Sequence, residues 1–342
     1  MVVINTIDIN PPLINSSSAW ASDFAQLREL YDCPYTGAIT TRTATPNGYP
    51  ENETHTVTFS ATAATSLNSY GYSPHPLRSY IAWVYELLST PTEAASLPTK
   101  PIIISITSAT PTTLKEMVTE VTQLRSRLHD FHLARERPAV GAVDPSTLVA
   151  VELNTSCPNI KDTPPPAYSF DLLLPFLDAL ASAYYEDPTL TIGLKLPPYL
   201  YSTSFREVVQ HLSTYSRPGP NENEKMNPFA FVTCTNTLGS SLMFNDQVAV
   251  TGPNTPFALP TPLGGLGGEA LHSLALGNVY SFRQLFVQHS DPAIQKIVII
   301  GVGGVTSSAA RQRMVQAGAS VVGCATLLGQ LGVKAFQLLT GD

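Results

Sequence analysis

The sequence predicts an α/β protein, a (β/α)₈ TIM barrel with an N-terminal extension and inserted loops over its C-terminal face. Short apolar or β-branched runs recur along the 342 residues, and each is followed by a longer segment with helical spacing. None of the runs alternates polar and apolar residues, so parallel strands covered on both faces are indicated. Polar residues and glycines concentrate directly after the runs, where a barrel carries its active site.

Eight strands with intervening helices close into a barrel, whereas a doubly wound open sheet is the alternative. We expect residues 1–342 to form a single domain. In chain order, the runs are Pro12–Ser17, Gly37–Thr41, Pro101–Thr107, Leu148–Asn154, Thr191–Leu196, Phe229–Thr235, Lys296–Gly301 and Ser320–Cys324.

Four stretches interrupt this rhythm and are expected to be loops or insertions, because they are rich in Pro, Asn, Ser or charge. They are Pro46–His75, Arg135–Pro145, Pro158–Tyr168 and Ser216–Pro228. The first is longer than an ordinary connection in a compact domain, and such loops are usually functional or disordered. We expect the third, which follows Cys157 and contains several prolines, to act as a lid over the site.

Composition excludes several classes of protein. Hydrophobic residues make up 43% and charged residues 13%, so the chain can bury a large core. A net charge of −7 argues against a nucleic-acid binder. No apolar run approaches the roughly 20 residues that cross a bilayer, and the N-terminus lacks a signal sequence. The cysteines are too scattered for a disulfide framework or a metal site. We therefore expect a soluble, cytoplasmic protein without a bound metal.

The motif Asn154-Thr-Ser-Cys157-Pro-Asn159 closes the fourth run. A thiol on a proline-bounded loop at a barrel's mouth can serve as a general base or a nucleophile. The two asparagines beside it can donate and accept hydrogen bonds. An inert buried cysteine is the alternative, but the position after a strand and the flanking amides favour a functional thiol.

Lys195 lies inside the otherwise apolar fifth run, in Gly193-Leu-Lys195-Leu-Pro197. A lysine in such a strand is costly unless its ammonium meets an anion or an electron-rich ring. Stabilising negative charge on a reduced flavin ring would suit it. The alternative is a side chain that extends to the rim of the barrel.

Two glycine clusters, Leu263–Gly268 and Gly301–Gly304, lie beside the sixth and seventh runs. Glycine allows backbone N–H groups to close on a phosphate, and barrels often hold phosphate after strands seven and eight. Ala325 and Thr326 follow the eighth run. In the long second loop, Asn68 with Tyr70 and Tyr72 could recognise a planar ring, or could simply pack within the loop.

Together these motifs resemble the class 1 dihydroorotate dehydrogenases. The similarity runs in order from Leu13–Ser18 to Gly318–Thr326, and its most specific pieces are Asn154–Asn159, Gly193–Tyr199 and Cys234–Gly239. The resemblance implies an FMN barrel that oxidises dihydroorotate to orotate. It implies that Cys157 takes the C5 proton while a hydride leaves C6 for flavin N5, with Lys195 and Arg42 completing the catalytic set.

The resemblance also assigns contacts. The positions similar to pyrimidine contacts are Arg42, Asn68, Tyr70, Gly71, Tyr72, Asn154, Asn159, Asn236 and Thr237. The positions similar to flavin contacts are Ser16, Ser17, Arg42, Thr43, Asn154, Lys195, Thr235, Gly267, Gly303, Gly304, Ala325 and Thr326. The soluble class 1A resembles this chain more closely than the membrane-bound class or the class with an iron–sulfur partner. That resemblance implies a homodimer with a fumarate-like soluble electron acceptor.

One position departs from the family's motif. The family usually has Thr-Lys-Thr where this chain has Thr41-Arg42-Thr43, and arginine is larger, planar and forked. We expect Arg42 to enter the mouth of the barrel and bind a substrate carboxylate, the alternative being a side chain turned to solvent. Smaller departures are Ser18 and Ala325 in place of glycine, and Tyr70 and Tyr72 in place of aliphatic residues. They leave open a related FMN oxidoreductase with a different cyclic or enoate substrate, a flavin-binding pseudoenzyme, and a flavin-free barrel.

Overall fold

The computed structural model describes residues 1–90, 98–134, 143–157, 159, 165–221, 224–250 and 256–341. At its centre lie eight strands in the order β3-β16-β15-β12-β9-β8-β7-β4, paired in parallel. A parallel bridge between Ile14 and Ala38 joins the two outer strands and closes the ring. The prediction of a (β/α)₈ barrel is therefore confirmed, and the open sheet is wrong.

Each predicted run contains one barrel strand. They are β3 (Leu13–Asn15), β4 (Ile39–Thr40), β7 (Ile102–Ile106), β8 (Val149–Asn154), β9 (Thr191–Leu196), β12 (Phe229–Cys234), β15 (Val298–Val302) and β16 (Val321–Cys324). Their side chains alternate between two buried layers, which explains why the runs are apolar throughout. On β8, Val149 and Val151 pack in the outer core under the helices, whereas Ala150 belongs to the barrel interior.

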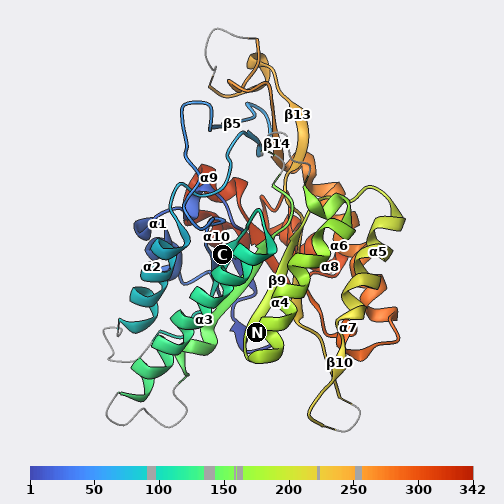
Figure 1. The fold of residues 1–342 in the computed structure, drawn as a ribbon. Coiled ribbons are helices and arrows are strands. Elements are labelled where there is room, and N and C mark those ends of the chain that lie inside the picture. The colour runs from blue at the N-terminus through green and yellow to red at the C-terminus, as the bar shows by residue number, and fades with distance from the viewer. Residues whose placement is uncertain are drawn as a thin grey trace.

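Helices surround this barrel, as Figure 1 shows. The α-helices are α1 (Phe24–Asp32), α2 (Leu77–Ser89), α3 (Pro111–Leu133), α4 (Leu174–Glu186), α5 (Ser202–Thr214), α6 (Glu269–Gln288), α7 (Pro292–Gln295), α8 (Ser308–Ala317), α9 (Thr326–Leu331) and α10 (Lys334–Thr340). The 3₁₀ helices are η1 (Ala19–Ala21), η2 (Pro145–Leu148), η3 (Pro166–Tyr168), η4 (Phe170–Leu173) and η5 (Asn245–Gln247). Local chemistry sets several helix starts: the side chains of Asp23, Thr110 and Ser307 accept hydrogen bonds from the first turns of α1, α3 and α8.

The N-terminal extension plugs one end of the barrel. Strands β1 (Val2–Ile4) and β2 (Ile7–Ile9) form an antiparallel hairpin. Ile4, Ile7 and Ile9 are buried against barrel-interior residues such as Phe231. The hairpin turn is tied to the barrel because Thr6 Oγ1 donates to the carbonyls of Thr147 and Thr189. Figure 1 places this end opposite the projecting sheet described next.

An antiparallel sheet projects from the other end, in the order β13-β14-β6-β5. Its strands are β5 (Val57–Phe59), β6 (Thr65–Asn68), β13 (Leu238–Leu242) and β14 (Leu263–Gly268). The expectation of a loop over Pro46–His75 is therefore only partly right, and the first glycine cluster forms a strand rather than a turn. Glycine is required there because a Cβ on Gly264 would lie 2.6 Å from the Asn68 carbonyl oxygen.

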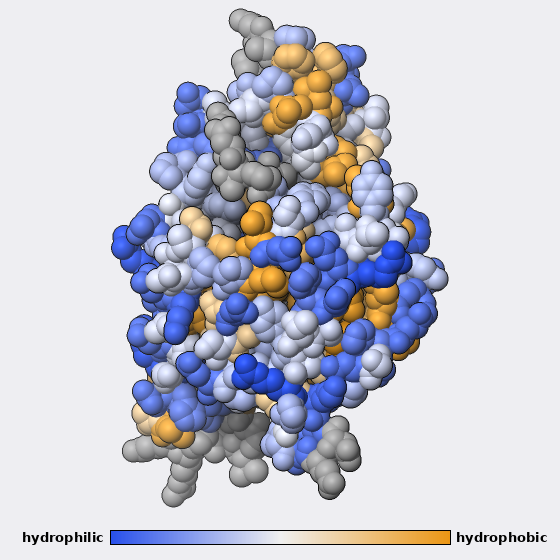
Figure 2. Space-filling model, turned by 45° about the vertical axis from the view of Figure 1, so that its right-hand side comes forward, coloured by the Kyte–Doolittle hydropathy of each residue, from blue (hydrophilic) through white to orange (hydrophobic). Residues whose placement is uncertain are grey.

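Two smaller features complete the described fold. The predicted loop Ser216–Pro228 contains a short hairpin, β10 (Arg217–Pro218) with β11 (Lys225–Met226). Apolar side chains gather on the projecting end of the molecule in Figure 2, where Leu242, Phe244 and Leu263 are exposed. Within the described ranges, no helix combines the length and apolar character that crossing a membrane would need.

Candidate active site

A pocket, here called the mouth pocket, lies at the carboxyl ends of the barrel strands, beside the antiparallel sheet. Its position is the one in which (β/α)₈ enzymes carry their active sites. Most of the sequence-predicted residues meet in its wall. The lining residues are Ser16, Ser17, Ser18, Ala19, Trp20, Arg42, Thr43, Ser66, Asn68, Tyr70, Gly71, Tyr72, Asn154, Cys157, Asn159, Lys195, Thr235, Asn236, Thr237, Val302, Ala325 and Thr326.

Two asparagines form the amide centre of the mouth pocket. Asn154, the last residue of β8, donates from Nδ2 to Thr43 Oγ1 at 3.0 Å. Its Oδ1 accepts from Asn236 Nδ2 at 3.1 Å, and that same amide nitrogen donates to the Ser156 carbonyl at 2.9 Å. Both side chains are therefore fixed in orientation, as recognition of a hydrogen-bonding ring requires.

A third asparagine connects the barrel loop to the antiparallel sheet. Asn159 Nδ2 donates to the Asn68 carbonyl at 3.1 Å, to Asn68 Oδ1 at 3.0 Å and to the Tyr70 carbonyl at 2.8 Å. Asn68 in turn donates to the Gly265 carbonyl on β14 at 3.1 Å. Residues 158 and 160–164, on which the lid prediction depends, lie outside the described residues, so the lid stays a prediction.

Cys157 is partly buried at the wall of the mouth pocket. Burial raises the pKa of its thiol, because an apolar surrounding disfavours the thiolate. The backbone N–H of Asn159 and the positive charges of Lys195 and Arg42 act in the opposite direction and lower that pKa. The thiol therefore lies among groups that stabilise its charged form, which suits a base that must ionise to act.

Lys195 points from β9 into the barrel and is 5% exposed. Its ammonium donates to the Ser17 carbonyl at 3.1 Å. Burial lowers the Lys195 pKa, whereas the negative charge of Glu152 raises it. Glu152, on the neighbouring strand β8, is 2% exposed and accepts hydrogen bonds from Ser105 at 3.2 Å and Thr233 at 2.6 Å. Burial raises the Glu152 pKa, and Lys195 lowers it. The alternative of a lysine extending to the rim is therefore wrong.

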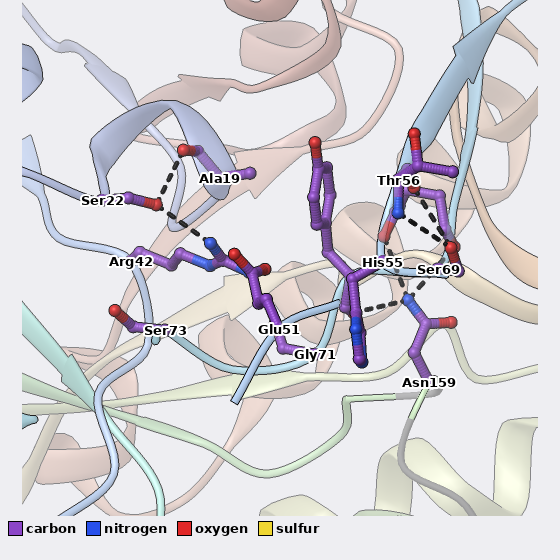
Figure 3. Close-up of polar contacts among 12 residues, drawn as sticks. Ala19, Ser22, Arg42, Glu51, His55, Thr56, Ser69, Gly71, Ser73 and Asn159 are labelled. Atoms are coloured by element: carbon purple, nitrogen blue, oxygen red, sulfur yellow. Dashed lines mark hydrogen bonds and ion pairs between the residues drawn. The ribbon is translucent and has the colours of Figure 1, made fainter. Parts of the chain in front are cut away.

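Arg42 also points inward and is 4% exposed, so the solvent-facing alternative is wrong. Its Nη1 donates to Ser22 Oγ at 3.1 Å, and its Nη2 donates to the Gly71 carbonyl at 3.3 Å and to Glu51 Oε1 at 2.5 Å. Figure 3 shows the Arg42 and Glu51 side chains pointing toward one another. The guanidinium thus contacts a carboxylate of the protein itself.

The glycines expected at a phosphate do not line the mouth pocket directly. Gly303 and Gly304 have φ angles of 127° and 66°, which side-chain-bearing residues rarely adopt. Their turn is held by His272, whose Nδ1 lies 2.8 Å from the Gly303 carbonyl oxygen. Arg313 Nε donates to the other ring nitrogen at 3.2 Å, so His272 donates its Nδ1 proton to Gly303. A Cβ on Gly267 would lie 3.2 Å from Thr326 Oγ1, so this glycine keeps the wall open.

Several residues of the site were not predicted from the sequence. Trp20 and Ser66 line the mouth pocket, and Glu51 and Glu152 contact the predicted cations from behind the wall. Ser66 could have been found, because it alternates with Asn68 along one strand. Within the described residues, no group of three or more His, Cys, Asp or Glu side chains could hold a metal ion.

The fold and this pocket define a (β/α)₈ barrel with an amide-rich, thiol-bearing site at its C-terminal face. The family model described as dihydroorotate dehydrogenase matches residues 2–341, and the chain belongs to this family.

Three similar proteins are described as dihydroorotate dehydrogenase A (fumarate). One from Streptococcus agalactiae is 33% identical over 192 residues, which cover 56% of this chain and 53% of that protein. One from Streptococcus pneumoniae is 35% identical over 191 residues, covering 56% and 52%. One from Streptococcus pyogenes is 27% identical over 330 residues, covering 96% and 87%. The chain thus spans about half the length of the first two relatives and most of the third.

Proposed function

We propose that this protein oxidises dihydroorotate to orotate through bound FMN, as a class 1A-like dihydroorotate dehydrogenase. The observation that carries the proposal is that Cys157, Lys195 and the amides of Asn68, Asn154, Asn159 and Asn236 line one pocket. Membership of the family and the names of the relatives support it.

The residues present fit a flavin. Among the described residues, Ser18 Oγ and Thr235 Oγ1 are buried side-chain oxygens without a hydrogen-bond partner, and both residues line the mouth pocket. A buried hydroxyl without a partner is costly, so a polar ligand at this wall would satisfy both. Ser16, Ser17, Thr43 and Lys195 would hold the ring system. The turn at Gly303 and Gly304, with Thr326 at the start of α9, would hold the phosphate.

The chain's own groups would perform the proton chemistry. The Cys157 thiolate would take the proton from C5 of dihydroorotate, and the bond from Cys157 Sγ to that proton would form as the C5–H bond breaks. The fixed amides of Asn154 and Asn236 would orient the pyrimidine ring so that C5 faces the sulfur. When bound, FMN supplies the acceptor for the hydride that leaves C6. Lys195 would place positive charge beside the ring that receives it.

Further parts of the proposal concern the whole protein. The relatives' names include fumarate, which supports a fumarate-like soluble acceptor. A homodimer in the cytoplasm is proposed from the resemblance to class 1A. A second candidate keeps the flavin barrel but changes the substrate to another cyclic or enoate compound, and the contact between Arg42 and Glu51 favours it.

Two measurements on the purified protein test the proposal. Its absorbance spectrum should show one FMN per chain, after supply of FMN during refolding if needed. Addition of dihydroorotate under anaerobic conditions should then bleach the flavin, and fumarate should restore its colour. A protein that takes up no flavin would contradict the cofactor assignment. A flavin-loaded protein that dihydroorotate does not reduce would favour the second candidate.

A further inference from the structure

Glu51 forms a contact with Arg42 that changes the electrostatics of the mouth pocket. Glu51 lies in the segment between β4 and β5, and its Oε1 accepts from Arg42 Nη2 at 2.5 Å. The exposed fraction of the Arg42 side chain is 5%, whereas that of the Glu51 side chain is 27%. A cation enclosed by the protein is therefore neutralised by an anion that remains in reach of solvent.

The hydrogen-bond donors of Arg42 are largely committed. Both terminal nitrogens already donate to protein oxygens, Nη1 to Ser22 and Nη2 to Glu51 and the Gly71 carbonyl. The guanidinium also lies 5.2 Å from the centre of the Tyr70 ring, which fixes its plane. A ligand carboxylate that binds the fork with two parallel hydrogen bonds must therefore share Nη2 with Glu51 or displace it.

The charges around the mouth pocket are balanced. Lys195 is accompanied by Glu152 within the barrel, and Arg42 is accompanied by Glu51 at the mouth. Like charges brought together in a desolvated site repel each other strongly. A carboxylate arriving beside Arg42 would meet the Glu51 carboxylate, whereas an uncharged ring would not.

We infer that Glu51 is a specificity-determining residue that disfavours ligands carrying a carboxylate at Arg42 relative to the same ring without one. The inference rests on the proposed function, because it concerns the ring site of that reaction. Glu51 acts as an internal competitor: it occupies Arg42 in the free protein and must swing into solvent when an anionic substrate binds. Its partial exposure and its place in an inter-strand segment permit that movement.

The test compares two ligands on the FMN-loaded protein: orotate, which carries the carboxylate, and uracil, which has the same ring without it. Binding is measured by calorimetry and by perturbation of the flavin absorbance. Glu51→Gln should bind orotate roughly tenfold or more tightly than the parent, because the competing charge is gone. Its affinity for uracil should change by less than about twofold, since an uncharged ring meets no like charge in either protein.

Glu53→Gln is the matched control. Glu53 is exposed on the same segment, so its substitution makes the same change in net charge away from Arg42. Both affinities should stay at the parent values in this variant. Equal gains in orotate affinity from Glu51→Gln and Glu53→Gln would overturn the inference, because general charge would then explain them.

Two further variants keep the inference falsifiable. Glu51→Ala should reproduce the gain for orotate if the glutamine side chain disturbs the segment. In an Arg42→Ala background, the substitution of Glu51 should no longer favour orotate over uracil, because the fork they compete for is absent. An unchanged or weaker orotate affinity in both Glu51 variants, with FMN retained, sinks the inference.

Failure of the inference is distinguishable from failure of the proposed function. If dihydroorotate reduces the parent's flavin but the Glu51 variants bind orotate as the parent does, only the role of Glu51 is wrong. If neither the parent nor the Glu51 variants bind orotate, and dihydroorotate reduces no flavin, the proposed function is wrong as well.

Discussion

Cys157 shows how a single side chain depends on its surroundings. Its sulfur lies among the amides of the mouth pocket, and the charges of Lys195 and Arg42 act on it. Burial is the larger influence and raises the thiol pKa above the ordinary value of about 8.5. At neutral pH the thiol form therefore predominates, and only the thiolate can accept the substrate proton.

We expect the rate of flavin reduction by dihydroorotate to rise with pH and to keep rising above about pH 8.5, as the thiolate fraction grows. Cys157→Ala should lose roughly 10²–10⁴-fold in this rate, the usual contribution of a positioned base. Stopped-flow absorbance across a pH series measures both effects. Retained flavin absorbance in the variant is the control for folding. A flat pH profile, or near-parental reduction in Cys157→Ala, would show that another group takes the proton.

At the residue scale, the sequence predicts most of the mouth pocket because the active-site positions of a barrel follow directly from its strands. Cys157 and Lys195 could be found in this way, since each stands out chemically beside an apolar run. Glu51 could not be found, because its role depends on a contact between two separate segments. The inward direction of Arg42 was expected, but its carboxylate partner is a residue of the protein itself rather than a ligand.

Strand β9 illustrates packing at the scale of an element. Gly193 faces the Phe231 ring, which fills the barrel interior, and a Cβ at this position would lie 2.2 Å from that ring. Overpacking of this kind forces neighbouring side chains and backbone to shift. Helix α6 offers the opposite case, because a Cβ on Gly277 would meet nothing within 4 Å.

We expect Gly193→Ala to lower the free energy of unfolding by about 1–3 kcal/mol. The matched variant Gly277→Ala should raise it by about 0.4–1 kcal/mol, because alanine restricts the unfolded chain and favours the helix. Urea unfolding followed by circular dichroism measures both. Equal stability of the two variants would contradict the packing assigned to the barrel interior.

The elements differ in how well the sequence predicts them. Barrel strands such as β8 and β9 are continuous apolar runs buried on both faces, so their pattern is visible locally. The antiparallel sheet is not visible in this way. Strand β14 contains four glycines, which normally disfavour strands, and it forms because the close approach of β6 leaves no room for side chains. Its partners β5 and β6 pair with it across a long sequence separation.

The whole molecule brings the mouth pocket together from distant parts of the chain. Wall residues come from the ends of β3, β4, β8, β9 and β12, from β6 in the projecting sheet and from the start of α9. The hairpin β1–β2 closes the opposite end. A ligand that contacts all these segments can bind only the folded chain, so binding must be coupled to stability.

We therefore expect FMN to raise the stability of the protein in proportion to its concentration. At 100 times its dissociation constant, a ligand that binds only the folded state adds about 2.7 kcal/mol. Thermal unfolding of flavin-depleted protein, titrated with FMN, measures the shift in Tm. Riboflavin, which has the same ring but no phosphate, is the matched control. It should stabilise less than FMN at equal concentration, because the turn at Gly303 and Gly304 would then lack its anion. Equal shifts from the two flavins would show that this turn does not hold the phosphate, even if the ring binds where Lys195 and Thr235 indicate.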